Sequence, residues 1–295
     1  MTEPPFEPAT LGARRPAPRA LLAGASTIRY PLGSLGAWDG PPRTPVHSAG
    51  RCEGTGTCAR ACPTGAIEVD REPGTSTVRL DYGKCLFCGL CVDACPSGAM
   101  TSVPFEEMAV TRRSDLVLQH GPGAGPTAPI DMAQEVRERV QRLYGTSLAI
   151  RAVDAGSCNG CEVEVAALLW PRYDMERLGI HLVASPRHAD ALLVTGPVTR
   201  NMRLALEKTY RSVPGPSFVV AVGACGISGG PFFGSPEVEG GVDRVLPVEV
   251  YVPGCPPSPI SLLYGLWLAL GKVDQRVTCG ELPSPADRPA DHARN

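Results

Sequence analysis

The sequence lacks both a strong net charge and a long apolar run. Its formal net charge is −2, so the basic footprint of a nucleic-acid-binding domain is absent. The longest apolar run, Ile260 to Leu270, is too short to span a bilayer. It predicts a buried helix, with a docking surface as the alternative. Export is not expected either, because Pro16 and Pro18 follow Arg14-Arg15 and the next apolar stretch is very short.

Glycine, proline and cysteine are the abundant residues. The 295 residues include 33 Gly and 31 Pro, more than average but fewer than disorder requires, which fits loop-rich domains. All of the 12 cysteines except Cys279 lie in metal-ligand spacings, which indicates a reducing interior rather than a disulfide framework. Cys279 is predicted to be a free thiol. The length allows two domains.

One cysteine run has the spacing of a ferredoxin. Its order is Cys85-x2-Cys88-x2-Cys91-x3-Cys95-Pro96. In such runs three thiolates hold one iron–sulfur cluster and the fourth reaches another cluster. The run recurs 33 residues earlier, in the order Cys52, Thr55, Cys58 and Cys62-Pro63. This internal duplication predicts a two-cluster ferredoxin with pseudo-twofold symmetry.

Ligand exchange between the two copies of the motif then assigns the cysteines to two clusters. One set is complete and predicts a [4Fe-4S] cluster: Cys62, Cys85, Cys88 and Cys91. The other set has three thiolates, Cys52, Cys58 and Cys95, with Thr55 at the fourth position. Because a hydroxyl is a hard, weak ligand for iron, this first site predicts a [3Fe-4S] cluster or a [4Fe-4S] cluster with a non-cysteine corner. Alternatives are an empty, degenerate site or substitution by Glu53 or His47.

A third set of cysteines follows a different pattern. Apolar strand-like runs occupy residues 148–153, 191–195, 218–222 and 248–252, with helical stretches at 162–170 and 200–210 between them, which predicts a parallel α/β sheet. Three of these strands lead into cysteine within a few residues, and ligands of open α/β sheets gather beyond the carboxyl ends of the strands. We therefore expect one further cluster, held by Cys158, Cys161, Cys225 and Cys255. Structural zinc and ordinary buried cysteines are the alternatives.

These patterns predict an α/β protein in which an N-terminal α+β two-cluster ferredoxin domain precedes a flavodoxin-like parallel-sheet domain. The expected order is a Pro-rich, partly flexible segment (1–45), the ferredoxin domain (46–119), a Gly/Pro linker (120–130), the sheet domain (131–283) and a flexible tail (284–295). Thr27 to Pro31 is expected to dock on the ferredoxin fold. Asp131, with Gln134, predicts the start of a helix that ends near Tyr144.

Three segments that contain these cysteines are distinctive: Gly156 to Glu162, Gly223-Ala224-Cys225 and Pro253 to Pro257. They closely resemble the small subunit of nickel–iron hydrogenases, in the complex-I-related, membrane-associated branch that includes formate hydrogenlyase and energy-converting hydrogenases. The matching subunit of complex I, the NADH-quinone oxidoreductase, carries adjacent cysteines where this chain has Cys158-x2-Cys161. Residues 27–105 resemble the ferredoxin-like subunit of the same complexes, in which position 55 is normally cysteine. The chain thus resembles a fusion of two subunits.

The resemblance implies an electron-transfer subunit without a catalytic site of its own. Cys158, Cys161, Cys225 and Cys255 would ligate the proximal [4Fe-4S] cluster beside the nickel–iron centre of a large subunit. Further implied partners are membrane-arm subunits and an external electron donor or acceptor protein, with a peripheral place on the cytoplasmic face of the inner membrane. Glu162 and Glu164 are candidates for a proton path, or simply face solvent or a partner. The rival functions are a complex-I-like quinone oxidoreductase and a non-catalytic redox sensor.

Overall fold

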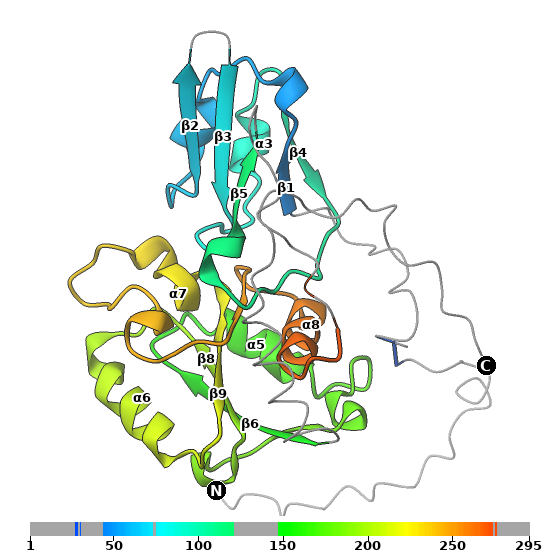
Figure 1. Ribbon diagram of the computed structural model, residues 1–295, viewed down its shortest axis with the longest axis vertical. Helices are drawn as coiled ribbons and strands as arrows, with labels where there is room; N and C mark the ends of the chain where they lie inside the picture. Colours follow the sequence, from blue (N-terminus) through cyan, green and yellow to red (C-terminus); the bar gives the residue numbers. More distant parts are fainter. Residues whose placement is uncertain are drawn as a thin grey trace, which may run out of the picture.

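The computed structural model describes residues 27–28, 30, 44–72, 75–120, 147–273 and 275. Figure 1 shows these residues as two parts, an upper part built from residues 44–120 and a lower part built from residues 147–273. We call them the ferredoxin half and the sheet half. The predicted helix that begins at Asp131 lies outside the described residues, as does Cys279.

The ferredoxin half contains two small antiparallel sheets, β1–β4 and β2–β3–β5. Its elements are β1 (Thr44–His47), η1 (Ala49–Arg51), α2 (Thr57–Ala61), β2 (Ile67–Glu72), β3 (Thr75–Asp81), α3 (Leu90–Asp93), β4 (Met100–Val103), η2 (Arg113–Leu116) and β5 (Val117–His120). The two strands expected between the cysteine runs are β2 and β3, so that part of the prediction is confirmed.

The 33-residue duplication of the sequence is also a duplication of structure. His47 pairs with Met100 in the β1–β4 sheet, and the residues 33 positions away from these two, Leu80 and Ile67, pair in the β2–β3 sheet. The short helices α2 and α3 begin after left-handed Gly56 and Gly89, which are again 33 residues apart. The two motifs therefore present their cysteines on equivalent backbones.

The sheet half is built on five parallel strands in the order β10-β9-β8-β6-β7. The direction of the chain across the sheet reverses between β6 and β8, which is the flavodoxin-like arrangement with its switch point there. The elements are β6 (Leu148–Asp154), α5 (Gly160–Ala167), η3 (Met175–Leu178), β7 (Ile180–Leu182), η4 (Pro186–His188), β8 (Ala191–Thr195), α6 (Arg200–Ser212), β9 (Phe218–Val222), α7 (Gly223–Ser228), η5 (Gly230–Phe232), η6 (Val242–Arg244), β10 (Val250–Val252) and α8 (Pro259–Ala269).

The predicted fold class is confirmed, and four of the five strands of this sheet were expected. The strand that the pattern missed is β7, which is three residues long and places His181 on an exposed position. Such a short segment carries no recognisable period. Its place at the sheet edge comes from parallel pairing with β6, which is a tertiary contact.

Both faces of the sheet are buried, as expected of a parallel sheet. Along β8, Leu192 and Val194 face a core that is continuous with the ferredoxin half, whereas Ala191 and Leu193 face a second core that contains α8. Nearly all side chains of α8 are buried, so the apolar run at 260–270 packs inside the protein, as predicted. Among the described residues, no helix combines the length and apolar character needed to cross a bilayer.

The two halves meet at β10, the strand that leads to Cys255. Val110 and Tyr251 exchange backbone hydrogen bonds of 3.0 and 2.8 Å. Beside them, Glu106 accepts hydrogen bonds from the hydroxyls of Ser258, at 3.2 Å, and Ser261. The ferredoxin half is thereby held against the edge of the sheet at which the third set of cysteines lies.

The segment around Thr27 docks on the sheet half, so the expectation that it docks on the ferredoxin fold is wrong. The N–H of Ile28 donates to the Arg172 carbonyl at 2.8 Å, and the Thr27 hydroxyl donates to the Pro171 carbonyl at 2.7 Å. Tyr30 is buried in the core that contains α8. The expectation followed a linear resemblance, which carries no information on the packing partner. The predicted domain boundaries stay predictions.

Substitutions in helix α6 test how this helix packs against the sheet. Leu206 is the one fully buried side chain of α6, so Leu206→Ala should lower the free energy of unfolding by about 2–5 kcal/mol. Leu204 on the same helix is 58% exposed, so Leu204→Ala should change it by at most about 0.5 kcal/mol. Denaturant unfolding of the anaerobically purified chain measures both, and equal losses would contradict this packing.

Candidate iron–sulfur sites

The two ferredoxin motifs form equivalent loops around their cysteines. The hydroxyls of Thr64 and Ser97 both lie 3.7 Å from the thiol two residues earlier in the chain, that of Cys62 or Cys95. Backbone N–H groups also donate to these sulfurs, from Ala66 to Cys62 at 3.2 Å and from Met100 to Cys95 at 3.4 Å. Hydrogen bonds of this kind stabilise thiolate and tune the reduction potential of a cluster.

Sequence reasoning missed Thr64 and Ser97 as hydroxyl neighbours of the thiols, although the 33-residue repeat aligns them. Their effect is visible at Cys95. Burial by itself raises the pKa of this thiol, but hydrogen bonds from the backbone of Met100, the Ser97 hydroxyl and the backbone of Ala99 and Ser97 together outweigh burial, so the pKa lies below its ordinary value. The loop thus favours thiolate at Cys95, which is the form that binds iron.

The structure brings the thiols together across the two motifs. Burial raises the pKa of the Cys85 thiol to about 12, and the neighbouring thiols that add to the rise are Cys91, Cys62 and Cys88. Burial likewise raises the pKa of Cys58, and its neighbours are Cys95 and Cys52. Each group joins cysteines of one motif to the last cysteine of the other, which is the pattern that ligand exchange requires.

Thr55 occupies the position of Cys88 on a loop that keeps the ligand-loop backbone. Gly54 and Gly56 flank it with φ of 65° and 67°, where the intact motif has Phe87 at 54° and Gly89 at 80°. Thr55 is exposed and shares a hydrogen bond of 3.2 Å with the Thr57 hydroxyl. Arg60 donates to the Thr55 carbonyl at 3.1 Å. The loop shape of a cluster ligand is therefore retained without the thiol.

The two alternative ligands for this position lie in different surroundings. His47 is buried in β1, at the position equivalent to the core residue Leu80. Glu53 is exposed beside Cys52.

The third set of cysteines converges at the carboxyl edge of the parallel sheet. Cys158 and Cys161 follow β6, Cys225 lies in α7 directly after β9, and Cys255 follows β10. Burial raises the pKa of Cys225 to about 11, with the thiols of Cys255 and Cys158 as neighbours. Burial also raises the pKa of Cys161, for which Glu162 is the nearest negative group and all three other thiols are neighbours.

Local hydrogen bonds hold the loop that carries the first two of these cysteines. The Asp154 carboxylate accepts from the N–H groups of Gly156 and Ser157 at 2.8 and 2.7 Å. The Ser157 hydroxyl donates to Glu162 at 2.7 Å, and Thr195 at the end of β8 donates to the same carboxylate. Glu162 therefore ties the cysteine loop to the switch point of the sheet, and its carboxylate accepts hydrogen bonds from two hydroxyls.

The residues around these thiols fit a cluster. A methyl group built on Gly223 would lie 2.7 Å from the Cys161 sulfur, and one on Gly230 would lie 2.9 Å from the Cys225 sulfur. Glycine at both positions leaves room against the sulfurs that a side chain would fill, and Gly223 needs its left-handed φ of 79°. Four soft thiolates are the donor set of an iron–sulfur cluster.

Within the described residues, no three Cys, His, Asp or Glu side chains are spaced to hold a single metal ion. A single zinc ion binds thiolates at about 2.3 Å, which requires the four sulfurs to be close together, whereas a cage of several irons requires them to be further apart. The ferredoxin motifs on the same chain are what favour a cluster over structural zinc at these thiols.

The three thiol groups lie in a row. The Cys91 thiol, in the complete ferredoxin set, has Cys58 of the incomplete set among its neighbours. The Cys255 thiol, in the sheet half, has Cys88 of the complete set among its neighbours. The complete ferredoxin site thus lies between the Thr55 site and the site at the sheet edge.

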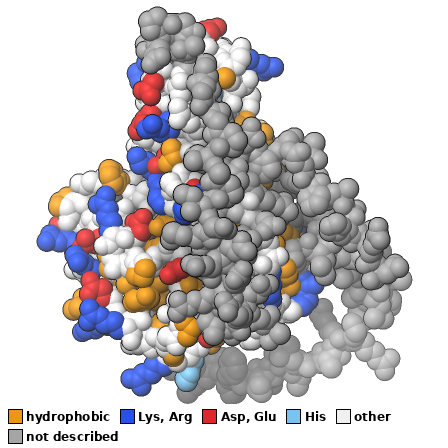
Figure 2. Space-filling view, viewed as in Figure 1, with side chains coloured by type: hydrophobic (Ala, Val, Ile, Leu, Met, Phe, Trp, Pro, Cys, Tyr) orange, Lys and Arg blue, Asp and Glu red, His pale blue; other side chains and the backbone are white. Residues whose placement is uncertain are grey.

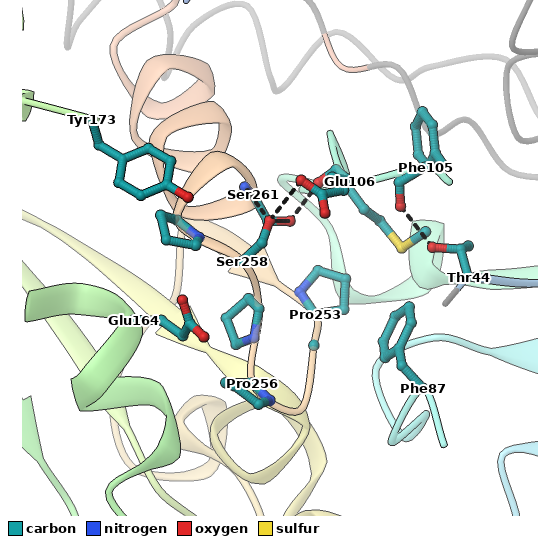
Figure 3. A pocket seen from close by; sticks show the side chains of 14 residues that line it. Thr44, Phe87, Phe105, Glu106, Glu164, Tyr173, Pro253, Pro256, Ser258 and Ser261 are labelled. Carbon is teal, nitrogen blue, oxygen red and sulfur yellow. Dashed lines mark hydrogen bonds between the residues drawn. The ribbon is translucent and has the colours of Figure 1, made fainter. Parts of the chain in front are cut away.

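A cavity of about 150 Å³ lies where the two halves meet (Figure 3). Phe87, from the loop between Cys85 and Cys88, faces it from the ferredoxin half, and Pro256 beside Cys255 faces it from the sheet half. Glu164 and Tyr173 also line it. The cavity is smaller than the 300–1,000 Å³ typical of small-molecule sites, and it borders the loops of two of the thiol groups.

Comparisons with known proteins agree with this division into halves. Residues 51–99 match the family model of the 4Fe-4S dicluster domain, and residues 158–269 match that of the NADH ubiquinone oxidoreductase 20 kDa subunit. A probable membrane-bound hydrogenase subunit (mbhJ) of Pyrococcus furiosus is 48% identical over 142 residues, which are 48% of this chain and 84% of that protein.

Two further relatives match over shorter shares of their length. Formate hydrogenlyase subunit 7 of Escherichia coli is 50% identical over 44% of this chain and 51% of its own length. A subunit of the NADH-quinone oxidoreductase of Bacteroides thetaiotaomicron is 48% identical over 40% of this chain and 60% of its own length. The chain therefore spans only about half to three fifths of these two proteins.

Fold, thiol groups and family matches together define an oxidoreductase subunit with a ferredoxin half that suits 4Fe-4S clusters. The chain belongs to the family of the NADH ubiquinone oxidoreductase 20 kDa subunit, which includes the membrane-bound hydrogenase and NADH-quinone oxidoreductase subunits above.

Ligand exchange between the motifs predicts an effect that the linear order of the cysteines does not. Cys62→Ala, in the first motif, should remove the spectrum of the second cluster, because Cys62 lies with Cys85 and Cys91. Electron paramagnetic resonance of the reduced chain and iron analysis measure this. Cys279→Ala is the control and should leave both unchanged. Loss of the first cluster's signal alone in Cys62→Ala would contradict the grouping.

Proposed function

We propose that the chain is the electron-transfer subunit of a membrane-associated nickel–iron hydrogenase-type complex. Electrons pass between an external donor or acceptor protein and the active site of a large subunit, through the two ferredoxin clusters and then the proximal cluster. The observation that carries this proposal is the row of thiol groups, linked by the proximity of Cys58 to Cys91 and of Cys88 to Cys255. The 48% identity to a membrane-bound hydrogenase subunit supports the choice of complex.

The proposed ligands follow the three thiol groups. They are Cys52, Cys58 and Cys95 for the first cluster, Cys62, Cys85, Cys88 and Cys91 for the second, and Cys158, Cys161, Cys225 and Cys255 for the proximal cluster. The clusters supply the electron-carrying chemistry when bound. The chain itself supplies thiolates and N–H donors to sulfur, which help set the reduction potentials.

The large subunit is proposed to cover the sheet edge at the proximal site. Cys158 and Cys255 are exposed there. Val163 in α5 is 55% exposed, and Phe232 and Phe233, which follow the glycine against Cys225, are 47% and 58% exposed. Exposed apolar side chains beside exposed thiols indicate a surface that a partner shields from water and oxidants.

The remaining partners follow from the same relatives. We propose contact with membrane-arm subunits and a peripheral position on the cytoplasmic face of the inner membrane. No nucleic-acid partner is proposed: basic and acidic side chains are interspersed over the sheet half on the face seen in Figure 2, which fits the net charge of −2.

Purification of the native assembly tests the proposed function. We expect stoichiometric nickel together with the iron of three clusters, and hydrogen-dependent reduction of a dye. A quinone reductase of the complex I type predicts no nickel and quinone-dependent turnover, and a redox sensor predicts neither activity. An assembly that lacks nickel and does not oxidise hydrogen would contradict the hydrogenase function while leaving the three clusters in place.

The first cluster is proposed to be a [3Fe-4S] cluster or a [4Fe-4S] cluster with a non-cysteine corner at Thr55. The retained loop backbone around Thr55 supports this proposal. Thr55→Cys restores the fourth thiol and should convert the first cluster to a [4Fe-4S] cluster with four cysteine ligands, visible by electron paramagnetic resonance. Thr57→Cys, which adds a thiol at the neighbouring hydroxyl, is the matched control and should leave the spectrum as it is. Two ordinary, fully cysteine-ligated signals from the unmodified ferredoxin half would exclude the proposal.

A further inference from the structure

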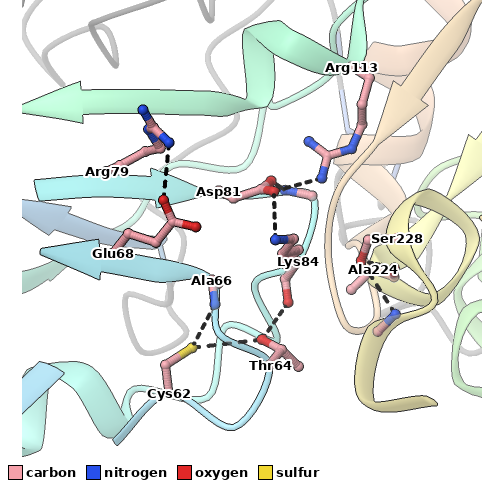
Figure 4. A network of polar contacts seen from close by, with 12 residues as sticks. Cys62, Thr64, Ala66, Glu68, Arg79, Asp81, Lys84, Arg113, Ala224 and Ser228 are labelled. Atoms are coloured by element: carbon pink, nitrogen blue, oxygen red, sulfur yellow. Dashed lines mark hydrogen bonds and ion pairs between the residues drawn. The ribbon is translucent and has the colours of Figure 1, made fainter. Parts of the chain in front are cut away.

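A cation lies against the turn that leads into the second ferredoxin cluster. Arg113 belongs to η2, in the segment that connects the ferredoxin half to the sheet half, and its side chain is 25% exposed. Its Nη2 lies 2.8 Å from Oδ2 of Asp81, at the end of β3 (Figure 4). The turn from Asp81 to Cys85 is where the ligand loop of this cluster begins.

The guanidinium of Arg113 lies directly on the backbone of that turn. A methyl group built on Gly83 would be 2.6 Å from its Cζ, so a side chain at position 83 would displace the cation from this place. Asp81 also accepts from the Gly83 N–H at 2.9 Å and lies 4.0 Å from the Lys84 ammonium. One carboxylate therefore faces two cations, which leaves a net positive charge at the turn.

The same turn is connected to the opposite side of the cluster site. The Thr64 hydroxyl donates to the Lys84 carbonyl at 2.8 Å, and the same hydroxyl lies 3.7 Å from the Cys62 sulfur (Figure 4). Cys62 and Cys85 are two of the four thiols of the second site. The charged turn is thus part of the frame that holds this site.

Part of the guanidinium has no partner. Nη1 of Arg113 is buried and has no hydrogen-bond partner in the part of the chain that the structure describes. A buried unpaired donor costs free energy, and a buried cation is stabilised by negative charge nearby. A cluster with four thiolates carries negative charge, and its reduction adds one unit more.

The charge of Arg113 also affects a residue of the sheet half, Tyr251. Burial raises the pKa of the Tyr251 hydroxyl to about 12, Asp243 raises it further, and the charge of Arg113 opposes the rise. Tyr251 lies in β10, the strand that leads to Cys255. The cation therefore lies at the junction between the second and the proximal sites.

We propose that Arg113 is an electrostatic positioning residue of the second cluster: its cation, fixed on Gly83 by Asp81, favours the reduced form and raises the reduction potential of that cluster. The proposal rests on the cluster assignment under the proposed function. The charge of Arg113 would stabilise an electron on the second cluster, which lies between the other two clusters. A purely structural brace would hold the turn without moving the potential.

The test is a redox titration of the native complex, followed by electron paramagnetic resonance. Arg113→Gln should shift the midpoint potential of the second cluster to more negative values, because a charge that favours the reduced form is removed. Arg113→Lys keeps the charge and should restore most of the potential.

The matched control is Arg79→Gln. Arg79 lies on the same strand as Asp81, and its ion pair with Glu68 is exposed on both sides, at 48% and 56%. The variant removes the same charge from the same half and should leave the potential unchanged. An equal shift in Arg79→Gln would overturn the proposal, because the effect would then be one of net charge.

An unchanged potential in Arg113→Gln, at full iron content, would also overturn the proposal. If that variant loses the cluster, Lys84→Gln takes its place; it removes the second cation that faces Asp81 and should give a smaller negative shift, and no shift there counts against the proposal. The absence of any second-cluster signal in the unmodified complex would instead refute the cluster assignment itself, so the two failures are distinguishable.

Discussion

The structure depends on gathering thiolates at places where burial alone would keep them protonated. Burial raises the pKa of Cys85, Cys91 and Cys225 to about 12, 11 and 11. A buried thiolate is stable only when positive charge compensates for lost hydration, and the irons of a cluster supply that charge. Folding and cluster binding are therefore linked in this chain.

Two different frameworks meet this requirement. In the ferredoxin half, short loops with left-handed glycines such as Gly56 and Gly89 carry closely spaced cysteines, and duplication brings a further thiol from the other motif beside them. In the sheet half, the cysteines are far apart in sequence and meet because parallel strands end at one edge. The Val110–Tyr251 pairing then holds the middle cluster site beside the third site.

Much of this arrangement could be predicted from residue spacing. Local patterns predict the duplication at 33 residues, the exchange of Cys62 and Cys95 between motifs, and the four main strands. They do so because the spacing of cysteines in a loop and the periodicity of a strand involve residues that are close together in the sequence. The short strand β7, the docking of Thr27 and Ile28 on residues 171–172 and the tie of Glu162 to Thr195 could not be predicted. Each of these depends on contacts between segments that local sequence does not pair.

The sequence by itself determined the number of thiol groups, the residues in them and the hydroxyl at Thr55, because soft ligands at fixed spacings specify iron–sulfur chemistry. The tertiary structure alone decided the order of the three sites and the surroundings of the middle one. Cys88 lies near Cys255, and Arg113 lies on Gly83. These residues become neighbours only when the two halves pack together, because no local sequence pattern predicts a contact between residues of different halves.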